Sequence, residues 1–113
     1  MQIIGTAKCR ETKKCRLWFD QRGISYHFVD LKKRDLSPGE LEALARGGGG
    51  WDALIDDQGK AWQKKQLAWK EYNPQEELME DNSLLRTPVV REGKEVIVGA
   101  QPDAWKKLAL SLK

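Results

Sequence analysis

The sequence contains few of the residues that build disulfide scaffolds and metal sites. Its 113 residues include two cysteines, Cys9 and Cys15, and one histidine, His27. So few cysteines cannot form a disulfide framework. A structural zinc site usually takes its ligands in closely spaced pairs, which these three residues do not provide. We therefore expect no disulfide framework and no bound metal ion.

Long apolar runs are absent as well. A membrane-spanning helix needs about 20 consecutive apolar residues, and no run in this chain approaches that length. The first residues lack the basic segment and the long apolar core of a secretory signal. The sequence therefore predicts a cytoplasmic protein without membrane contact.

Basic residues slightly outnumber acidic residues. The formal net charge is +3, and basic residues often stand beside acidic ones, as in Lys70-Glu71 and Arg91-Glu92. A mixed surface of this kind does not indicate direct binding of nucleic acid. The content of 40% hydrophobic and 33% charged residues is typical of a folded, soluble protein. The length favours a single domain over residues 1–113.

Cys9 stands where a short apolar strand leads into a predicted helix. A thiol at the N-terminus of a helix lies at the positive end of the helix dipole, near unpaired backbone N–H groups. Both stabilise the thiolate, which is the nucleophilic form of cysteine. Positive charge follows close by in the sequence, at Lys8, Arg10 and Lys13. Cys9 is therefore the candidate nucleophile.

Hydrophobic periodicity and turn residues predict a series of short elements. Ser37, Pro38 and Glu40 have the spacing of a helix N-cap followed by a capping box. The predicted strands are 2–4, 26–31, 89–91 and 95–98, and the predicted helices are 10–22, 38–46, 51–55, 64–72, 74–81 and 102–112. The glycines at 47–50 lack the Lys-Ser/Thr of a phosphate loop, so we interpret them as a flexible linker.

This order of elements predicts an α/β fold. The strand–helix–strand unit at the start favours a parallel pair, and the two late strands form an antiparallel hairpin. We therefore expect a small mixed four-stranded sheet with flanking helices, interrupted by a helical insertion over about residues 37–83.

Short motifs occur in order along almost the whole chain. They include Lys8-Cys9-x-x-Thr12, Arg22-Gly23-Ile24-x-Tyr26, Ala53-Leu54-Ile55-Asp56, Leu84-Leu85-Arg86-Thr87-Pro88-Val89-Val90-Arg91 and Val98-Gly99-x-x-Pro102-x-x-Trp105. Together they resemble the arsenate-reductase-like (ArsC/Spx) family, and most of all its glutaredoxin-like, ArsC-related branch. The resemblance implies a thioredoxin-like fold, with Cys9 as the redox residue and Pro88 as a cis-proline beside it.

The chain departs from the arsenate reductases that it resembles. The resemblance implies that those enzymes hold the oxyanion with three arginines, whose positions fall here at Asp52, Thr87 and Gln101. Arginine donates two aligned, charge-assisted hydrogen bonds to an oxyanion, whereas an aspartate repels it. A true arsenate reductase is therefore the second alternative function.

Cys15 follows Cys9 by six residues. Along a helix this spacing is a rise of about 9 Å with a large rotation, and a disulfide needs Cα atoms within about 7 Å. We expect Cys15 to be a buried core thiol, the alternative being a resolving cysteine. Cys9 would then act as a single thiol that attacks a mixed disulfide and is released by glutathione or a protein thiol.

Several residues are expected to support Cys9. Thr12, one turn along the helix, can hydrogen-bond the thiolate. The backbone of Thr87, beside Pro88, can pair with an extended thiol ligand, and Arg86 can attract an anionic one. The predicted contacts for glutathione, a co-substrate rather than a bound cofactor, are Lys8, Lys13 and Thr87.

The sequence thus predicts a cytoplasmic thiol oxidoreductase coupled to glutathione. The first alternative is a non-enzymatic, Spx-like regulatory or protein-binding module. Spx regulators resemble the chain at Leu84-Leu85-Arg86-x-Pro88, but they carry a Cys-x-x-Cys switch whose second position is Thr12 here. The insertion contributes aromatic and basic residues that form either its core or a partner surface, namely Trp51, Trp62, Trp69, Lys60, Lys64 and Lys65.

Overall fold

A mixed sheet forms the centre of the molecule. The computed structural model describes residues 1–112, in which four strands have the order β2-β1-β3-β4. β1 (Gln2–Gly5) pairs in parallel with β2 (His27–Asp30) and antiparallel with β3 (Val89–Glu92), which pairs antiparallel with β4 (Glu95–Val98). The predicted sheet is confirmed, including the late hairpin, whose turn contains Gly93 at a φ of +58°.

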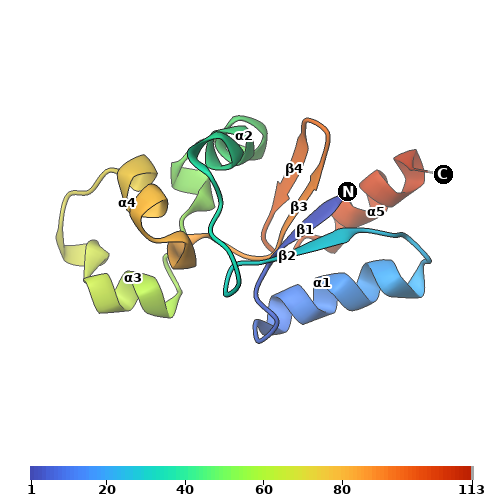
Figure 1. Ribbon diagram of the computed structural model, residues 1–113, viewed down its shortest axis with the longest axis horizontal. Helices are drawn as coiled ribbons and strands as arrows, with labels where there is room; N and C mark the ends of the chain where they lie inside the picture. Colours follow the sequence, from blue (N-terminus) through green and yellow to red (C-terminus); the bar gives the residue numbers. More distant parts are fainter. Residues whose placement is uncertain (113) are drawn as a thin grey trace.

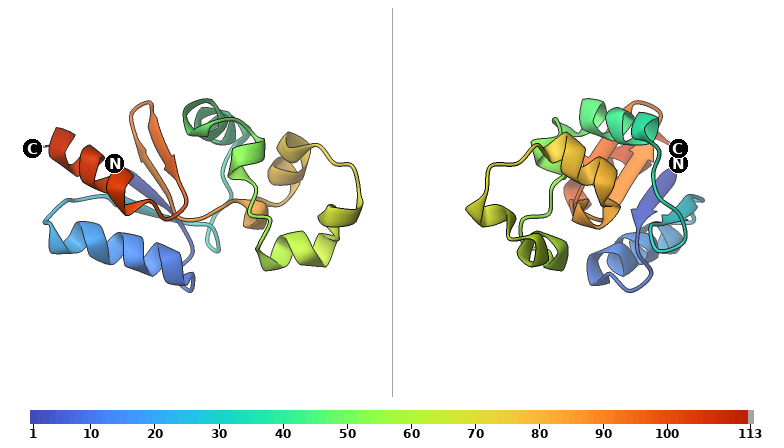
Figure 2. Two further views of the ribbon diagram at one scale, coloured as in Figure 1. Left: turned by 180° about the vertical axis from the view of Figure 1, so that it is seen from behind. Right: turned by 60° about the vertical axis from the view of Figure 1, so that its left-hand side comes forward.

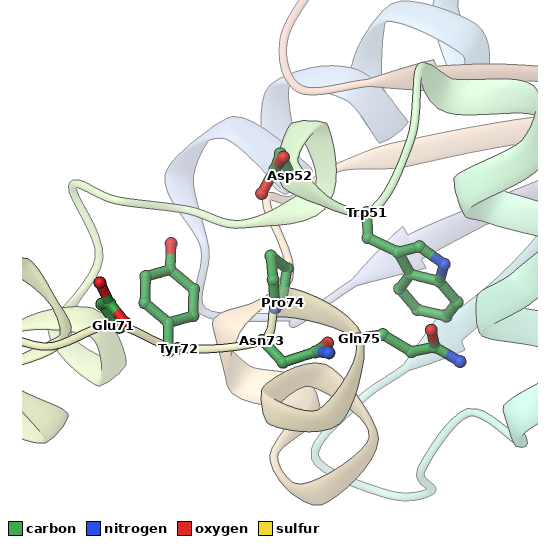
Figure 3. A pocket seen from close by; sticks show the side chains of 7 residues that line it. All are labelled: Trp51, Asp52, Glu71, Tyr72, Asn73, Pro74 and Gln75. Atoms are coloured by element: carbon green, nitrogen blue, oxygen red, sulfur yellow. The ribbon is translucent and has the colours of Figure 1, made fainter.

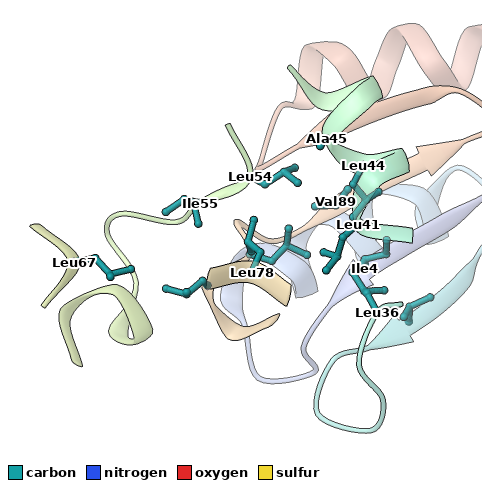
Figure 4. Packing of buried hydrophobic residues seen from close by; sticks show 13 residues of the cluster. Ile4, Leu36, Leu41, Leu44, Ala45, Leu54, Ile55, Leu67, Leu78 and Val89 are labelled. Carbon is teal, nitrogen blue, oxygen red and sulfur yellow. The ribbon is translucent and has the colours of Figure 1, made fainter. Parts of the chain in front are cut away.

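Helices cover both faces of the sheet (Figure 1). One face carries α1 (Arg10–Gln21) and α5 (Pro102–Ser111), and the other carries α2 (Pro38–Gly48). Successive residues of a strand point to opposite faces, so Ile3 and Ile4 of β1 belong to different clusters. Ile3 packs in a buried cluster with Phe19 and Trp105, whereas Ile4 belongs to the larger cluster that continues into the insertion (Figure 4).

The start of α2 follows its local sequence. The Ser37 hydroxyl accepts a hydrogen bond from the Glu40 N–H, and the Glu40 carboxylate accepts one from the Ser37 N–H. This reciprocal pair satisfies backbone donors that the first turn leaves unpaired. Arg34 adds a forked contact to Glu40, with both N–O distances 3.0 Å. The predicted capping box is therefore confirmed.

The segment between β2 and β3 is helical and extends to one side of the sheet (Figures 1 and 2). After α2 it contains η1 (Asp52–Leu54), α3 (Lys60–Lys65), η2 (Leu67–Trp69), α4 (Pro74–Glu80) and η3 (Asn82–Leu84). Its outward reach gives the molecule extents of 45 × 26 × 25 Å. None of the helices in residues 1–112 combines the length and the apolar character needed to cross a membrane.

The predicted helix over 64–72 is wrong. α3 ends at Lys65, and Gln66 adopts a left-handed conformation with a φ of 57°. This reversal turns the next residue, Leu67, into the core, where it is buried. The burial of one apolar side chain thus outweighs the helical pattern of its neighbours.

The interpretation of residues 47–50 as a flexible linker is wrong for the first two glycines. Gly47 and Gly48 form the last turn of α2, and this turn lies directly against β4. A Cβ atom on Gly47 would lie 2.7 Å from the Lys94 carbonyl oxygen. The missing side chains therefore allow a helix and a strand to approach closely. The helix then ends at Gly49, whose φ is 99°.

Asn82 connects the insertion to the loop that follows β2. Its side chain is 6% exposed. Its Oδ1 accepts a hydrogen bond from the Leu36 N–H at 2.6 Å, and its Nδ2 donates one to the Leu78 carbonyl oxygen at 2.8 Å. One buried amide thus joins two segments that are 46 residues apart.

Candidate active site

Cys9 is the N-cap residue of α1. Its backbone is extended, with a φ of −72° and a ψ of 122°, and its carbonyl oxygen accepts the Lys13 N–H at 3.0 Å. The Cys9 N–H in turn donates to the Thr6 carbonyl oxygen at 3.1 Å, which closes the loop after β1. The thiol is consequently held at the N-terminal end of the helix, where unpaired N–H groups favour negative charge.

The surroundings of Cys9 favour its thiolate. Burial raises the pKa of the Cys9 thiol. Interactions with the side chains of Thr12 and Thr87 and with the N–H groups of Thr12 and Glu11 lower it, and together they outweigh the effect of burial, so that the pKa lies below its ordinary value. The Cys9 Sγ and the Thr87 Oγ1 are 3.4 Å apart. The favourable location predicted from the sequence is therefore present in the fold.

Thr12 lies behind Cys9 and is completely buried, with 0% exposure. Its Oγ1 is shielded from solvent and has no partner in hydrogen-bond geometry among residues 1–112. A buried hydroxyl left unpaired costs about 1–3 kcal/mol. The hydroxyl still lowers the pKa of Cys9, because a thiolate accepts from it more strongly than a neutral thiol does. Gly5 makes room for Thr12, since a Cβ atom on Gly5 would overlap its side chain.

Thr87 and Pro88 reach Cys9 from the other end of the chain. The Thr87–Pro88 peptide bond is cis, as the family resemblance implied. Pro88 is buried, and its carbonyl oxygen accepts the Gly99 N–H at 2.8 Å. Pairing of β1 with β3 brings this segment beside the loop of Cys9.

A cavity of about 950 Å³ opens beside Cys9. Thr6 and Thr87 line it near the thiol, and α3 and the segment after α4 supply much of the remainder. Five lysines line it, namely Lys8, Lys32, Lys60, Lys64 and Lys65. Four carboxylates line it as well, namely Asp35, Asp56, Glu80 and Asp81. The cavity therefore suits a ligand that carries both positive and negative groups.

The part of this cavity that follows β2 was not predicted from the sequence. Leu31, Lys32 and Asp35 follow β2 directly and line the cavity. The predicted parallel pairing of the first two strands indicated these residues, because the carboxyl ends of parallel strands meet at one edge of a sheet. The neighbouring positions of the loops after β1 and β2 could therefore have been predicted.

Arg86 and Lys13 lie outside the cavity lining. The Nη2 atom of Arg86 donates to the Ile55 carbonyl oxygen at 3.0 Å and lies 3.7 Å from the Asp57 carboxylate. Lys13 is exposed on α1 and shares a neighbouring hollow with Lys8. Of the predicted glutathione contacts, Lys8 and Thr87 line the cavity and Lys13 does not. The ligand roles of these three residues and of Arg86 stay predictions.

A second hollow, of about 690 Å³, lies in the insertion (Figure 3). Asp52 lines it together with Trp51 and Tyr72, and Cys9 does not. Gln101 lies elsewhere again, donating to the Val98 carbonyl oxygen at 2.6 Å. Of the three positions at which the arsenate reductases are expected to carry arginine, Thr87 alone borders the cavity of Cys9 in the described part of the chain.

Cys15 is a core residue, as expected. It is 0% exposed in the cluster beneath α1, and burial raises the pKa of its thiol to about 12. It therefore stays a neutral thiol at physiological pH, and it is free rather than disulfide-bonded. Within residues 1–112, no three His, Cys, Asp or Glu side chains are grouped so that they could share a metal ion.

Comparisons with known proteins agree with this geometry. The family model described as "ArsC family" matches residues 4–108. The "Global transcriptional regulator Spx 2" of Oceanobacillus iheyensis is 30% identical over 101 residues, which cover 86% of this chain and 75% of that protein.

Two solved structures extend the comparison to the fold. A protein described as YFFB superposes with a TM-score of 0.84 at 25% identity, over 94% of this chain and 96% of its own. An "Arsenate reductase from Vibrio cholerae" superposes with a TM-score of 0.78 at 16% identity, over 95% of this chain and 97% of its own. The fold is thus the thioredoxin-like fold that these proteins share.

Proposed function

Because this chain belongs to the ArsC family, we propose that it is a thiol-dependent oxidoreductase in which Cys9 is the nucleophile and glutathione the co-substrate. The observation that carries the proposal is the location of Cys9. Its thiol stands at the N-terminus of α1, 3.4 Å from the Thr87 hydroxyl and on the wall of a cavity of about 950 Å³. A lowered pKa provides the thiolate that disulfide exchange requires.

The proposed substrate is a mixed disulfide between glutathione and another thiol. The Cys9 thiolate attacks the glutathione sulfur, the S–S bond breaks, and the other thiol leaves as a thiolate that takes a proton from water. A second glutathione thiolate then attacks the glutathione sulfur bound to Cys9. This step releases the Cys9 thiolate and forms oxidised glutathione, so that one disulfide is reduced for each one formed.

The charges of the cavity support glutathione as the ligand. Glutathione carries two carboxylates and one ammonium group, and the cavity presents both lysines and carboxylates. Lys65 is already engaged by Glu77 and Asp81, at 3.5 and 3.9 Å. The other lysines of the lining form no salt bridge among residues 1–112 and can meet a carboxylate of the ligand, namely Lys8, Lys32, Lys60 and Lys64.

A single-thiol mechanism follows from the position of Cys15. This residue lies on the buried side of α1 and its thiol is not ionised near neutral pH, so an external thiol has to release Cys9. A protein thiol is the other candidate for this step. Either reductant has to be kept reduced, which favours the cytoplasm as the place of the reaction.

Turnover of a small mixed disulfide tests the proposal. The substrate is the mixed disulfide of glutathione and 2-mercaptoethanol, and oxidised glutathione is followed through NADPH and glutathione reductase. We expect turnover by the wild-type protein, none by Cys9→Ser, and most of the wild-type rate for Cys15→Ser. Loss of turnover in Cys15→Ser with retention in Cys9→Ser would overturn the assignment of the nucleophile.

A Spx-like binding module is the second candidate function. It is favoured by the 30% identity to a regulator and by Trp69, whose side chain is 89% exposed in the insertion. Aromatic residues are enriched in protein–protein interfaces. Under this hypothesis, affinity capture with Cys9→Ala retains the same partner as the wild type, and Trp69→Ala loses it.

Arsenate reduction receives less support from the site. Asp52 and Gln101 do not line the cavity, and the Arg86 guanidinium donates a hydrogen bond to the Ile55 carbonyl oxygen. Arsenate at millimolar concentration is therefore expected to leave the alkylation rate of Cys9 unchanged. Protection of Cys9 by arsenate, but not by sulfate, would instead favour the reductase.

A further inference from the structure

Positive charge is concentrated around the start of α1. Residues 8–14 contain four basic side chains and one acidic side chain, so this short segment carries the same excess charge as the whole chain, whose net charge is +3. We refer to the four basic residues, Lys8, Arg10, Lys13 and Lys14, as the basic face. All four are exposed.

The acidic residue of the segment neutralises little of this charge. Glu11 lies 3.6 Å from the Lys14 ammonium group, and both side chains are largely open to solvent. Exposed pairs of this kind are weak. Lys8, Arg10 and Lys13 form no salt bridge within the part of the chain that the structure describes. The basic face therefore presents a positive field to an incoming molecule.

The basic face is hollowed and lies next to the thiol. Its four residues line a depression of about 440 Å³ together with Leu17, whose apolar side chain is 56% exposed. Lys8 lines both this depression and the cavity of Cys9. A polypeptide that brings a sulfur to Cys9 can thus touch the cavity rim and the basic face at the same time.

We propose that the basic face docks an acidic polypeptide segment, and that this segment carries the cysteine from which Cys9 removes glutathione. The inference rests on the proposed function and names the class of its substrate. The cavity receives the glutathione half of the mixed disulfide, and Asp or Glu residues flanking the substrate cysteine meet the basic face. An apolar residue of the same segment covers Leu17.

The test compares peptide substrates that differ only in charge. Three synthetic decapeptides, each with one central cysteine linked to glutathione, carry Asp and Glu, Ser and Gly, or Lys flanking residues. We expect kcat/KM to be about tenfold higher for the acidic than for the basic peptide at low salt. The ratio should fall towards one in 0.5 M salt, where the screening length is only a few ångströms.

Charge reversal on the protein sharpens the test. In the double variant Arg10→Glu/Lys14→Glu, the acidic-to-basic ratio should fall below one. A change in the pKa of Cys9 alters the rates for both peptides equally, so it cancels in this ratio. Lys94→Glu is the matched control, because it has the same charge change in the hairpin between β3 and β4, on the opposite side of the molecule from the start of α1 (Figures 1 and 2).

The two proposals fail in different ways. A wild-type ratio near one, or a ratio that the double variant leaves unchanged, overturns the docking surface while turnover of the neutral peptide still supports the oxidoreductase. Absence of turnover with all three peptides and with the mixed disulfide of 2-mercaptoethanol overturns the oxidoreductase itself.

Discussion

The Sγ atom of Cys9 lies 3.4 Å from the Oγ1 atom of Thr87, although 78 residues separate them in the chain. The sheet explains this meeting. Cys9 follows β1, Thr87 precedes β3, and Ile4 of β1 is paired with Val89 of β3. The reactive group is therefore assembled by strand pairing from the two ends of the chain.

The pH dependence of Cys9 alkylation should reveal its thiolate. Because the pKa of Cys9 is lowered, its rate with iodoacetamide should reach half of its maximum below about pH 8.5, the pKa of a free cysteine thiol. Cys15, whose pKa is about 12, should stay unmodified in the folded protein. Peptide mass spectrometry resolves the two sites. A half-maximum at or above about pH 8.5 for Cys9 would contradict an activated thiol.

The same shift should appear in the stability of the fold. Between the lowered pKa and the pKa of about 8.5 of an unfolded cysteine, the folded Cys9 is a thiolate while the unfolded cysteine still binds its proton. The unfolding free energy therefore rises with pH across this window, and the gain is lost as the pH falls through the folded pKa. Urea unfolding of the wild type should show this slope relative to Cys9→Ser. Parallel pH profiles for the two proteins would count against it.

Replacing Thr12 by valine should stabilise the protein and slow its thiol. Valine has nearly the same shape and removes a buried hydroxyl that has no partner, so we expect a gain of about 1 kcal/mol at a pH low enough to keep Cys9 a neutral thiol. The pKa of Cys9 should rise at the same time, with alkylation at pH 7 slower by roughly threefold to tenfold. Thr87→Val should slow the thiol without the gain in stability. A loss of stability in Thr12→Val would show that the hydroxyl is paired.

Asn82→Ala should lower the unfolding free energy by about 2–4 kcal/mol, because it leaves the Leu36 N–H and the Leu78 carbonyl without their buried partner. The matched control is Asn73→Ala. That side chain is exposed and accepts one hydrogen bond, from the Glu76 N–H, as the N-cap of α4, so its loss should cost about 1 kcal/mol. Equal effects in urea unfolding would argue against a special role for Asn82.

Two glycines of α2 should respond to alanine in opposite directions. Gly47→Ala should destabilise the protein by about 1–3 kcal/mol, because its Cβ would press on the Lys94 carbonyl oxygen. Gly39→Ala should stabilise it by about 0.5–1 kcal/mol, because the nearest atom to its Cβ would be the Ser37 Oγ at 4.0 Å. Thermal unfolding measures both. An unchanged stability in Gly47→Ala would mean that β4 shifts to make room for the added Cβ atom.

The features predicted correctly are those with local causes. Ser37 and Glu40 cap a helix through neighbouring backbone groups, and Gly23 ends α1 at a φ of +68°. The strands were predicted from alternation and β-branched residues, and Cys9 from its place between a strand and a helix. Such signals lie within a few residues of the feature that they specify.

The features that were not predicted depend on contacts between distant segments. Gln66 is left-handed because Leu67 turns into a core built by other elements. Gly47 is helical because β4 lies against it. Likewise, the cavity combines a loop after β2 with the segment after α4. The hydrophobic periodicity of one segment does not show which distant segment it will pack against.

The residues that activate the thiol and those that form much of the cavity wall lie in different parts of the chain. The residues that activate the thiol come from the loop after β1, the first turn of α1 and the segment before β3, whereas much of the cavity wall belongs to the insertion that Asn82 ties in place. Substitutions in the insertion can therefore reshape the cavity without disturbing the thiolate. In a lineage that keeps this scaffold, new substrates could be acquired while the chemistry at Cys9 stays the same.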